Sequence, residues 1–362
     1  MKILVFPKAT NPYQDLLYKE MYKFSGFSYE YISFYFSKST IVNCMVFPMM
    51  LVLKRLQKFN ILHIHWLYEF SGVRGNTPFL KVFFTFYVLW VLHFIRMIGF
   101  KLIYTIHDIE THDKLFLFNK RVISSILHKS SHVIVLSKST LQMMESMSVP
   151  VSKTKITVIP HGNYIGQYEN TMTQKQARHA LQIHRNQFVL LFFGIIRAYK
   201  GVSELLQVLR EMDQKNNIVI IVAGMCYDEH VKHTIIEFSK DYPSHIRVVL
   251  KHIPDSEVQV YFNACDCAVL PFTNITNSGS AVLASSFKKP FIAPLLGSIR
   301  DFPRDSGIFY SPTQADGLRQ AIETARLSKT LSQKGSAGYE YVTKLSWSMV
   351  AKKTMNLFKA IQ

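Results

Sequence analysis

The segment FFGIIRAYKG, residues 192–201, has the residue types of an anion-binding loop. Its apolar start predicts a buried strand that ends at Gly194, and Arg197 and Lys200 come directly afterwards. Arginine and lysine at this spacing can clamp two adjacent phosphates, and the glycine lets the backbone approach them closely. Gly201 then opens a helix. The helix dipole disfavours positive charge at a helix N-terminus, so Arg197 and Lys200 are not expected there as ordinary solvated residues. The segment therefore predicts a diphosphate-binding site.

A second polar segment, PFTNITNSGS at residues 271–280, stands between a predicted strand and an apolar helix. Its TNSGS residues can present backbone N–H groups and hydroxyls to an anion, and helix capping accounts for only one of the serines. Two further predicted strands end in weaker signals. Gly224 follows one of them and the pair His252 and Ile253 follows the next, where each is placed to flank a nucleotide base. The predicted nucleotide-binding residues are Gly194, Arg197, Lys200, Gly224, His252, Ile253, Thr276, Asn277, Ser278, Gly279 and Ser280.

Acid–base residues gather in the first half of the chain. In YTIHDIETHD, residues 104–113, His107 and Asp108 follow a predicted strand, and Glu110 and Asp113 lie just beyond them. A histidine with nearby carboxylates can perform general acid–base chemistry or hold a sugar hydroxyl. These four residues are therefore candidate catalytic residues.

The neighbouring strand end reads HIHWLYEF, residues 63–70, and adds Glu69 to the catalytic candidates. The His-x-His pair lacks a third ligand at diagnostic spacing, so we expect no metal site, and two core histidines remain an equal alternative. His65 and Trp66 here, with His161 and Gly162 of VIPHG, are placed where an acceptor-binding cleft would form.

Short apolar runs alternate with stretches of helical period along the whole chain, which predicts parallel sheets covered on both faces. Ligands of such sheets bind at the carboxyl ends of the strands, where the motifs above stand. The length of 362 residues suits two domains. We expect domains at residues 1–165 and 166–342 and a final helix at 343–362. The predicted strands are 2–6, 28–33, 61–66, 102–106, 132–136, 156–159, 187–193, 217–223, 246–250, 267–270 and 290–293.

The composition favours a folded protein with an anionic partner. The chain has 42 Lys and Arg against 24 Asp and Glu, and 48% of its residues are apolar. Its lysines are scattered and no nucleic-acid-binding signature is visible, so a nucleic-acid partner is not expected. Four cysteines without a C-x-x-C pair fit a reducing compartment, and no signal peptide is evident.

Two apolar stretches in the first half leave membrane association open. The uncharged core of residues 79–100 runs only from Val82 to Leu92, which is short for a membrane span. Residues 46–53 form a shorter stretch followed by KRLQK. Each stretch either packs on a sheet or also dips into an anionic bilayer surface. Residues 1–165 carry 19 basic and 8 acidic side chains, which favours the second interpretation.

The ordered set of VIPHG, FFGIIRAYKG, the Gly224 strand end, TNSGS and a closing helix with Trp347 resembles nucleotide-sugar glycosyltransferases of the GT-B fold. The resemblance implies an α/β fold of two Rossmann-like domains that face each other across a cleft. It implies that Arg197 and Lys200 bind the donor diphosphate, that His107 touches the transferred sugar, and that the last helix crosses back to the first domain. No cofactor and no metal are implied, with a sugar nucleotide as donor substrate.

One departure narrows the resemblance. Large retaining families of this fold carry two glutamates around TNSGS, and this chain has Ile275 and Leu283 at those positions. HIHW and the serine-rich loop look more like the bacterial exopolysaccharide mannosyltransferases, some of which invert the anomeric centre. An inverting enzyme needs a carboxylate base. Asp108, Glu110, Asp113 and Glu69 all remain open for that role.

The expected function is hexose transfer, with mannose from GDP-mannose as the first choice, onto a lipid-linked saccharide in bacterial surface-glycan synthesis. We expect a cytoplasmic enzyme held peripherally on the inner face of the plasma membrane. A UDP-sugar donor, a non-catalytic partner subunit and a sugar-nucleotide epimerase on the same fold are the alternatives.

Overall fold

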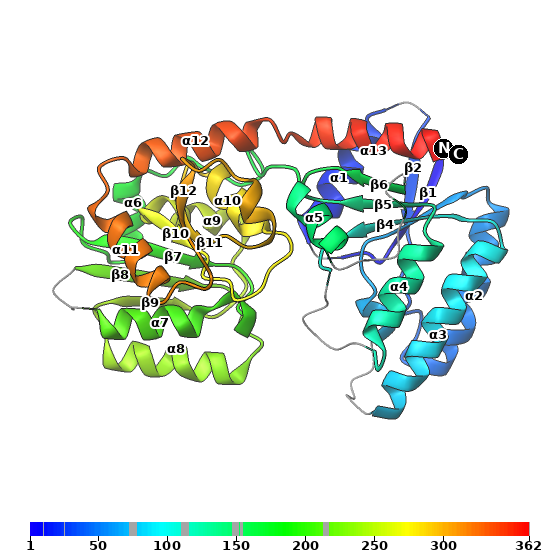
Figure 1. The fold of residues 1–362 in the computed structure, drawn as a ribbon, viewed down its shortest axis with the longest axis horizontal. Coiled ribbons are helices and arrows are strands. Elements are labelled where there is room, and N and C mark those ends of the chain that lie inside the picture. Colours follow the sequence, from blue (N-terminus) through cyan, green and yellow to red (C-terminus); the bar gives the residue numbers. More distant parts are fainter. Residues whose placement is uncertain are drawn as a thin grey trace. The chain divides into compact units, whose positions relative to one another are not determined.

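The computed structural model describes residues 1–9, 11–24, 26–71, 78–109, 116–146, 152, 155–212 and 217–361. The chain divides into two compact units, which are considered separately below (Figure 1). Unit 1 consists of Met1–Gly162 together with Trp347–Gln362, and unit 2 consists of Asn163–Ser346.

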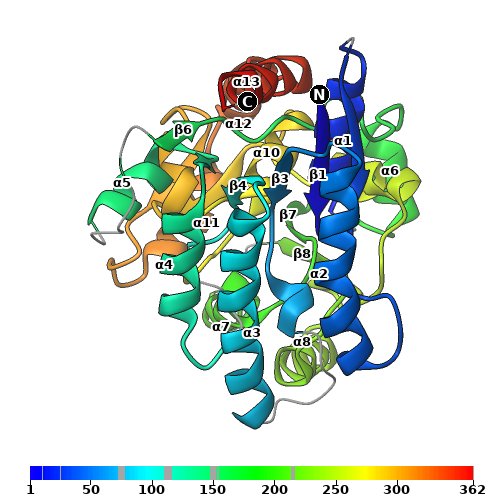
Figure 2. The same ribbon diagram turned by 90° about the vertical axis from the view of Figure 1, so that its right-hand side faces the viewer.

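Unit 1 is built on a six-stranded parallel sheet with the strand order β2-β1-β3-β4-β5-β6. The helices α2, α3 and α4 lie along one face, and α1 and α13 contribute to a separate core on the other (Figures 1 and 2). The strands are β1 (Lys2–Phe6), β2 (Ser28–Tyr31), β3 (Ile61–Ile64), β4 (Lys101–Ile106), β5 (His132–Val135) and β6 (Ile156–Val158). The helices are α1 (Pro12–Tyr22), α2 (Thr40–Leu56), η1 (Tyr68–Ser71), α3 (Pro78–Met97), α4 (Asn119–Lys129), α5 (Lys138–Ser146) and α13 (Trp347–Ile361).

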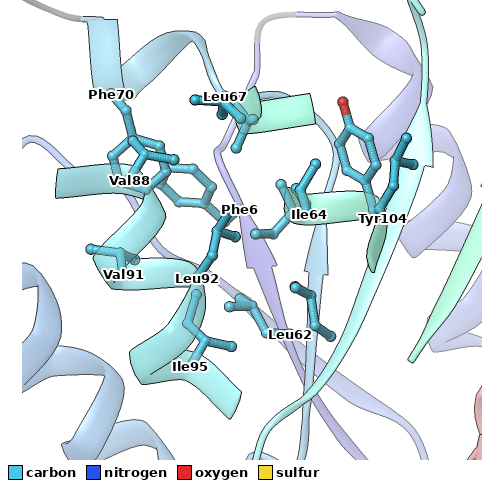
Figure 3. Close-up of a cluster of buried hydrophobic side chains, with 14 of the residues drawn as sticks. Phe6, Leu62, Ile64, Leu67, Phe70, Val88, Val91, Leu92, Ile95 and Tyr104 are labelled. Carbon is cyan, nitrogen blue, oxygen red and sulfur yellow. The ribbon is translucent and has the colours of Figure 1, made fainter. Parts of the chain in front are cut away.

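Alternation along the strands of unit 1 divides its core into two layers. Phe6, Leu62 and Ile64 point toward α3, where Val88 and Leu92 meet them (Figure 3). The residues between them in sequence, among them Ile3, Val5 and Ile61, pack with α1 and α13 instead. Both faces of the sheet are therefore buried, which explains the near-continuous apolar strands of the sequence.

Helix α3 is the one described helix that is long and apolar enough to cross a membrane, by length and composition alone. Such a helix is weak evidence for a span, because the core helix of a soluble protein passes the same test. One side of α3 is core: Val88, Val91 and Ile95 are buried against the sheet of unit 1 (Figure 3). Phe84 belongs to the same core cluster.

Unit 2 repeats the architecture with the strand order β12-β11-β10-β7-β8-β9, again all parallel. Its strands are β7 (Phe188–Phe193), β8 (Ile218–Ala223), β9 (Ile246–Val249), β10 (Cys267–Val269), β11 (Phe291–Pro294) and β12 (Gly307–Tyr310). Its helices are α6 (Gln174–Ala180), η3 (Ala198–Lys200), α7 (Val202–Glu211), α8 (Glu229–Asp241), η5 (Asp255–Glu257), α9 (Val258–Ala264), α10 (Gly279–Ser286), η6 (Gly297–Asp301), α11 (Gly317–Leu327) and α12 (Leu331–Thr343).

The predicted fold class is confirmed, since both units are α/β domains on parallel sheets. Each of the eleven predicted strands corresponds to an observed one, with ends that differ by at most two residues. The edge strand β12 was not predicted. It is four residues long and half of it is only partly buried, so it leaves no extended apolar run.

Candidate nucleotide and acid–base sites

The carboxyl ends of β7 and β8 form a tight glycine pair in unit 2. Gly194 and Gly224 follow the two strands with φ angles of +109° and +145°, which disfavour any side chain. A Cβ atom at Gly224 would lie 1.9 Å from the carbonyl oxygen of Gly194. The two loops stay paired beyond the strands, because the N–H of Ile196 donates to the carbonyl of Met225 at 2.8 Å. This edge therefore presents bare backbone where the sequence predicts a diphosphate.

Arg197 and Lys200 stand at the same edge. A Cβ atom at Gly194 would lie 3.6 Å from Lys200 Nζ, so the ammonium group is close to this glycine. The guanidinium of Arg197 lies 5.9 Å from the ring centre of Tyr227, a residue in the loop after β8. This distance is within the range of a cation–π contact. The two predicted cations are thus located around Gly194, with one of them steadied by an aromatic ring.

The loop after β7 is fixed against the loop after β10. Gly201 has a φ of +74°, and a Cβ atom there would lie 1.9 Å from the carbonyl oxygen of Pro271. The N–H of Thr273 also donates to the carbonyl of Tyr199 at 2.9 Å. Strands β7 and β10 are neighbours in the sheet, so the RAYKG segment meets the start of the loop that leads to TNSGS.

Ser278 serves as the N-cap of α10. Its hydroxyl accepts from the N–H of Ala281 at 3.1 Å, and its own N–H donates to Ser298 Oγ at 2.9 Å. Capping therefore explains this serine, which is buried with Thr276. The N–H groups of Gly279 and Ser280 belong to the first helical turn, which has no intrahelical acceptors for them. Both residues are partly exposed, whereas Ser278 is buried.

The remaining predicted nucleotide-binding residues differ in accessibility. After β9, His252 is exposed and Ile253 is buried, so Ile253 offers little surface to a nucleotide base. Asn277 is partly exposed beside the cap of α10. Ile275, which stands where related families carry a glutamate, is buried, and its carbonyl oxygen is tightly packed against Gly297.

In unit 1, a chain of hydrogen bonds joins three histidines from β3 and β4. His107 Nε2 lies 3.1 Å from His65 Nδ1, and His65 Nε2 lies 3.1 Å from the hydroxyl of Tyr18. The same hydroxyl lies 2.6 Å from His63 Nδ1. His63 Nε2 ends the chain 2.7 Å from Thr105 Oγ1. His63 and His65 are both buried, and the ring nitrogens of His65 are bonded to Tyr18 and His107.

Aromatic rings enclose the outer end of this chain. The ring of Trp66 stacks on His107 with the centres 4.1 Å apart, and Tyr13 of α1 approaches His107 edge-on at 4.9 Å. Tyr13 also contacts His161 and Trp347, at 5.1 and 5.3 Å. Within unit 1, therefore, His107, Trp66 and His161 of the predicted site come together.

Burial keeps these histidines neutral. It lowers the pKa of His63 to about 3 and that of His161 to about 4. It also lowers the pKa values of His65 and His107 well below the usual value, with further lowering by neighbouring histidines. At neutral pH the cluster can exchange hydrogen bonds but carries no positive charge.

The carboxylate candidates are separated by their surroundings. Glu69 is buried and accepts from the N–H of Phe34 at 2.6 Å and from the hydroxyl of Ser33 at 2.9 Å, so it holds the chain after β2. Burial raises the pKa of Glu69, against the lowering effect of these two bonds. Asp108 follows His107 at the end of β4 and is partly exposed. Glu110 and Asp113 lie outside the described residues.

Several parts of the site were not predicted. Tyr13 and Tyr18 come from α1, and Thr105 is the next-to-last residue of β4. Strand pairing gives a signal for Thr105. In the register of β3 and β4, His63 lies beside Ile103. Because side chains alternate along a strand, residues 63, 65, 105 and 107 then point to the same face. The described residues contain no group of three or more His, Cys, Asp or Glu side chains that could hold a metal ion.

Comparison with known proteins agrees with this arrangement. The family model described as glycosyl transferases group 1 matches residues 173–337, which lie in unit 2. A GDP-mannose:glycolipid 4-beta-D-mannosyltransferase of Xanthomonas campestris pv. campestris is 24% identical over 242 residues, which cover 66% of this chain and 62% of that protein. An uncharacterized glycosyltransferase of Methanocaldococcus jannaschii is 20% identical over 255 residues, which cover 64% of this chain and 60% of that protein. The match thus spans less than two thirds of these relatives.

Solved structures resemble the whole chain. Sucrose-phosphate synthase from Thermosynechococcus elongatus has a TM-score of 0.76 at 15% identity and covers 99% of this chain and 98% of its own. HepE of Anabaena, solved in complex with UDP-glucose, has a TM-score of 0.73 at 15% identity and covers 99% and 100%. At these identities the likeness concerns the fold alone.

The fold and the matched domain point the same way. The chain has the two-domain α/β fold of GT-B glycosyltransferases, and residues 173–337 of unit 2 match the glycosyl transferases group 1 domain. In sequence it resembles a bacterial mannosyltransferase.

Proposed function

We propose that the protein transfers a hexose from a sugar nucleotide to a saccharide hydroxyl, with the donor diphosphate bound at the β7 and β10 strand ends. The observation that carries the proposal is the position of Arg197 and Lys200 around Gly194. Their loop contacts the loop after β10, which leads to the helix start at Gly279 and Ser280. Two cations and free N–H groups next to bare backbone suit a diphosphate without a metal ion or cofactor.

The proposed donor is GDP-mannose and the proposed acceptor is a lipid-linked saccharide of bacterial surface-glycan synthesis. Support comes from the Xanthomonas relative, whose name gives GDP-mannose and a glycolipid as its substrates. A UDP-sugar is the second candidate, since HepE shares the fold and binds UDP-glucose. A transfer assay distinguishes them: radiolabelled GDP-mannose should deliver label to a lipid extract of the source cells, and UDP-glucose should not. Transfer from UDP-glucose alone would replace the donor and keep the class, and no transfer from either would favour a non-catalytic partner subunit.

For the carboxylate base of an inverting transfer we choose Asp108 among the described candidates. It follows His107 at the end of β4 and is partly exposed, whereas Glu69 is buried in the core. Loss of a general base costs about 10²–10⁴ in rate. Asp108→Asn should therefore lose about that much turnover while donor binding stays the same. If Glu110→Gln or Asp113→Asn shows the large loss instead, the base lies in that neighbouring segment.

The proposed location is the cytoplasmic surface of the plasma membrane, with unit 1 in contact with anionic lipid. The sides of α2 and α3 that face away from the sheet expose apolar residues at helical spacing, and neither helix contains an acidic residue. We call these residues the outer apolar face. They are Ile41, Met45, Met49, Leu53 and Leu56 on α2 and Phe79, Phe83, Phe86, Trp90 and Met97 on α3.

Three features of the outer apolar face favour lipid as its occupant. The helices α2 and α3 are neighbours (Figures 1 and 2). The hydroxyl of Tyr87 on α3 donates to the carbonyl of Cys44 on α2 at 2.9 Å. Large side chains such as Phe79 and Leu56 are 78% and 74% exposed, which is unusual for solvated helices. Exposed His93 and Arg96 on α3 add basic groups that suit anionic headgroups.

Vesicle sedimentation tests the location. The protein should bind vesicles that contain phosphatidylglycerol at low salt, bind less at high salt, and ignore pure phosphatidylcholine. The double variant Phe79→Ser, Trp90→Ser should lose binding. The control Leu327→Ser removes an equally exposed apolar side chain from α11 of unit 2 and should bind as before. Equal sedimentation of both variants with the wild type would overturn the lipid contact.

A further inference from the structure

The chain of hydrogen bonds behind His107 constrains where its histidines carry their protons. A neutral imidazole has one N–H donor and one bare nitrogen acceptor. Both ring nitrogens of His63 and both of His65 take part in the chain, and His107 takes part through Nε2. A ring that accepts at one nitrogen must donate from the other. The direction of any one link therefore decides the direction of its neighbours.

The direction is set at the buried end by Thr105. This residue is fully buried, and among the described residues its hydroxyl has His63 Nε2 as its one side-chain partner. If His63 donated to Thr105, the threonine hydroxyl proton would be left without an acceptor inside the core. A buried donor without an acceptor is costly, whereas an oxygen lone pair without a donor costs less. Thr105 therefore donates, and His63 Nε2 is the acceptor.

The same argument carries along the chain to His107. With Nε2 bare, His63 has its proton on Nδ1 and donates to the oxygen of Tyr18. Tyr18 is fully buried, and within the described part of the chain His65 Nε2 is the other acceptor its hydroxyl can reach. Tyr18 thus donates to His65, which in turn donates through Nδ1 to His107 Nε2.

From this geometry the structure assigns one shared tautomer: His63, His65 and His107 all carry their proton on Nδ1, and His107 directs an N–H donor away from the buried chain. Thr105, His63, Tyr18 and His65 are positioning residues for that donor. His107 cannot take a proton at Nε2, because His65 already donates there. His107 therefore serves as a hydrogen-bond donor through Nδ1, and the base of the transfer is a carboxylate. That role in transfer rests on the proposed function, while the tautomer assignment does not.

Histidine-selective ¹⁵N labelling and long-range ¹H–¹⁵N correlation spectra test the assignment without any substrate. Each signal is assigned by its loss in a single His→Asn variant. At pH 7.5 the three residues should all show the Nδ1–H pattern. An Nε2–H pattern at any of the three would overturn the proposal, whether or not the protein proves to be a mannosyltransferase.

A variant pair examines the continuity of the chain. Tyr18→Phe removes the acceptor of the His63 Nδ1 proton, so the His63 resonance should lose its hydrogen-bonded, downfield position. Tyr29→Phe is the matched control, because the Tyr29 ring stacks on Tyr18 at 5.0 Å and no hydrogen bond to a histidine is involved among the described residues. A His63 resonance that is unchanged in Tyr18→Phe would contradict the proposed chain of hydrogen bonds.

Substitution of His107 separates a donor from a base. An asparagine amide can place an N–H near the position of Nδ1, whereas leucine has no polar atom. As a donor, His107 should tolerate His107→Asn within about tenfold in kcat/KM, with at least about tenfold more lost in His107→Leu. A base would be lost in both variants, at about 10²–10⁴ each. Equal and large losses with unchanged donor binding would contradict the donor role.

Discussion

Gly162, at the end of the first segment of unit 1, packs directly against the indole ring of Trp347, the first residue of the segment that returns to this unit. A Cβ atom at Gly162 would lie 2.4 Å from Trp347 Cδ2 and Cε2, closer than any real contact. The adjacent His161 donates from Nδ1 to the carbonyl oxygen of Gly162 at 2.6 Å. The packing of Trp347 of α13 against this position thus explains the glycine in VIPHG. The sequence also predicts that Gly162 lies near an acceptor-binding cleft.

Gly162→Ala should destabilise the protein by about 1–3 kcal/mol, because the indole must move within a packed layer. Chemical denaturation measures the loss. Trp347→Leu in the same chain should relieve part of it, which gives a non-additive double-mutant cycle. Additive losses would show that the two residues are not in contact.

Stability should fall as the pH is lowered below about 6.5. The unfolded chain protonates its histidines near that pH, whereas burial lowers the pKa of His161 to about 4 and that of His63 to about 3. Below pH 6.5 the unfolded state therefore binds more protons, and each buried histidine weakens the fold by about 1.4 kcal/mol per pH unit down to its folded pKa. Glu69, whose pKa is raised by burial, opposes this trend at lower pH.

Urea midpoints at pH 7.5, 6.0 and 5.0 measure this dependence. His63→Asn removes one of the buried imidazoles and should reduce the slope between pH 6.5 and 5, even if the variant is less stable overall. The same dependence of the urea midpoint on pH in both proteins, or a flat profile for the wild type, would contradict this account. It would show that these histidines take up protons as readily in the folded state as in the unfolded state.

Ser278→Ala distinguishes capping from ligand binding at α10. The hydroxyl of Ser278 accepts from the N–H of Ala281, and loss of such a cap costs about 1 kcal/mol of stability. Nucleotide affinity should stay nearly unchanged, because the proposed contacts come from the N–H groups of Gly279 and Ser280. A large loss of nucleotide affinity at unchanged stability would show that the Ser278 hydroxyl binds the nucleotide.

The sequence was most informative where local pattern decides the structure. Strands buried on both faces leave continuous apolar runs, so β7 and β8 were predicted almost to the residue. The topology rule for parallel sheets then placed Gly194, Arg197 and the TNSGS segment at one edge. The edge strand β12 escaped because partial exposure interrupts its pattern.

The contacts that were missed depend on elements far apart in sequence. Nothing local to HIHW shows that Tyr18 of α1 lies beside His63 and His65, since that contact follows from helix packing over the sheet. The buried bonds of Glu69 to Ser33 and Phe34 are of the same kind. One-dimensional patterns indicate which residues could do chemistry, but the tertiary structure decides which of them already have a structural task.

The central claim is that Arg197 and Lys200 hold the diphosphate of a sugar nucleotide. Calorimetric titration of GDP and GDP-mannose, with EDTA and then with Mg²⁺, tests it most directly. We expect binding in EDTA that weakens by about 1–3 kcal/mol in Arg197→Ala and in Lys200→Ala. Arg210→Ala, which removes an exposed cation paired with Asp241 in the same unit, should bind like the wild type. Equal affinity in all four proteins, or binding that appears only with Mg²⁺, would contradict the account.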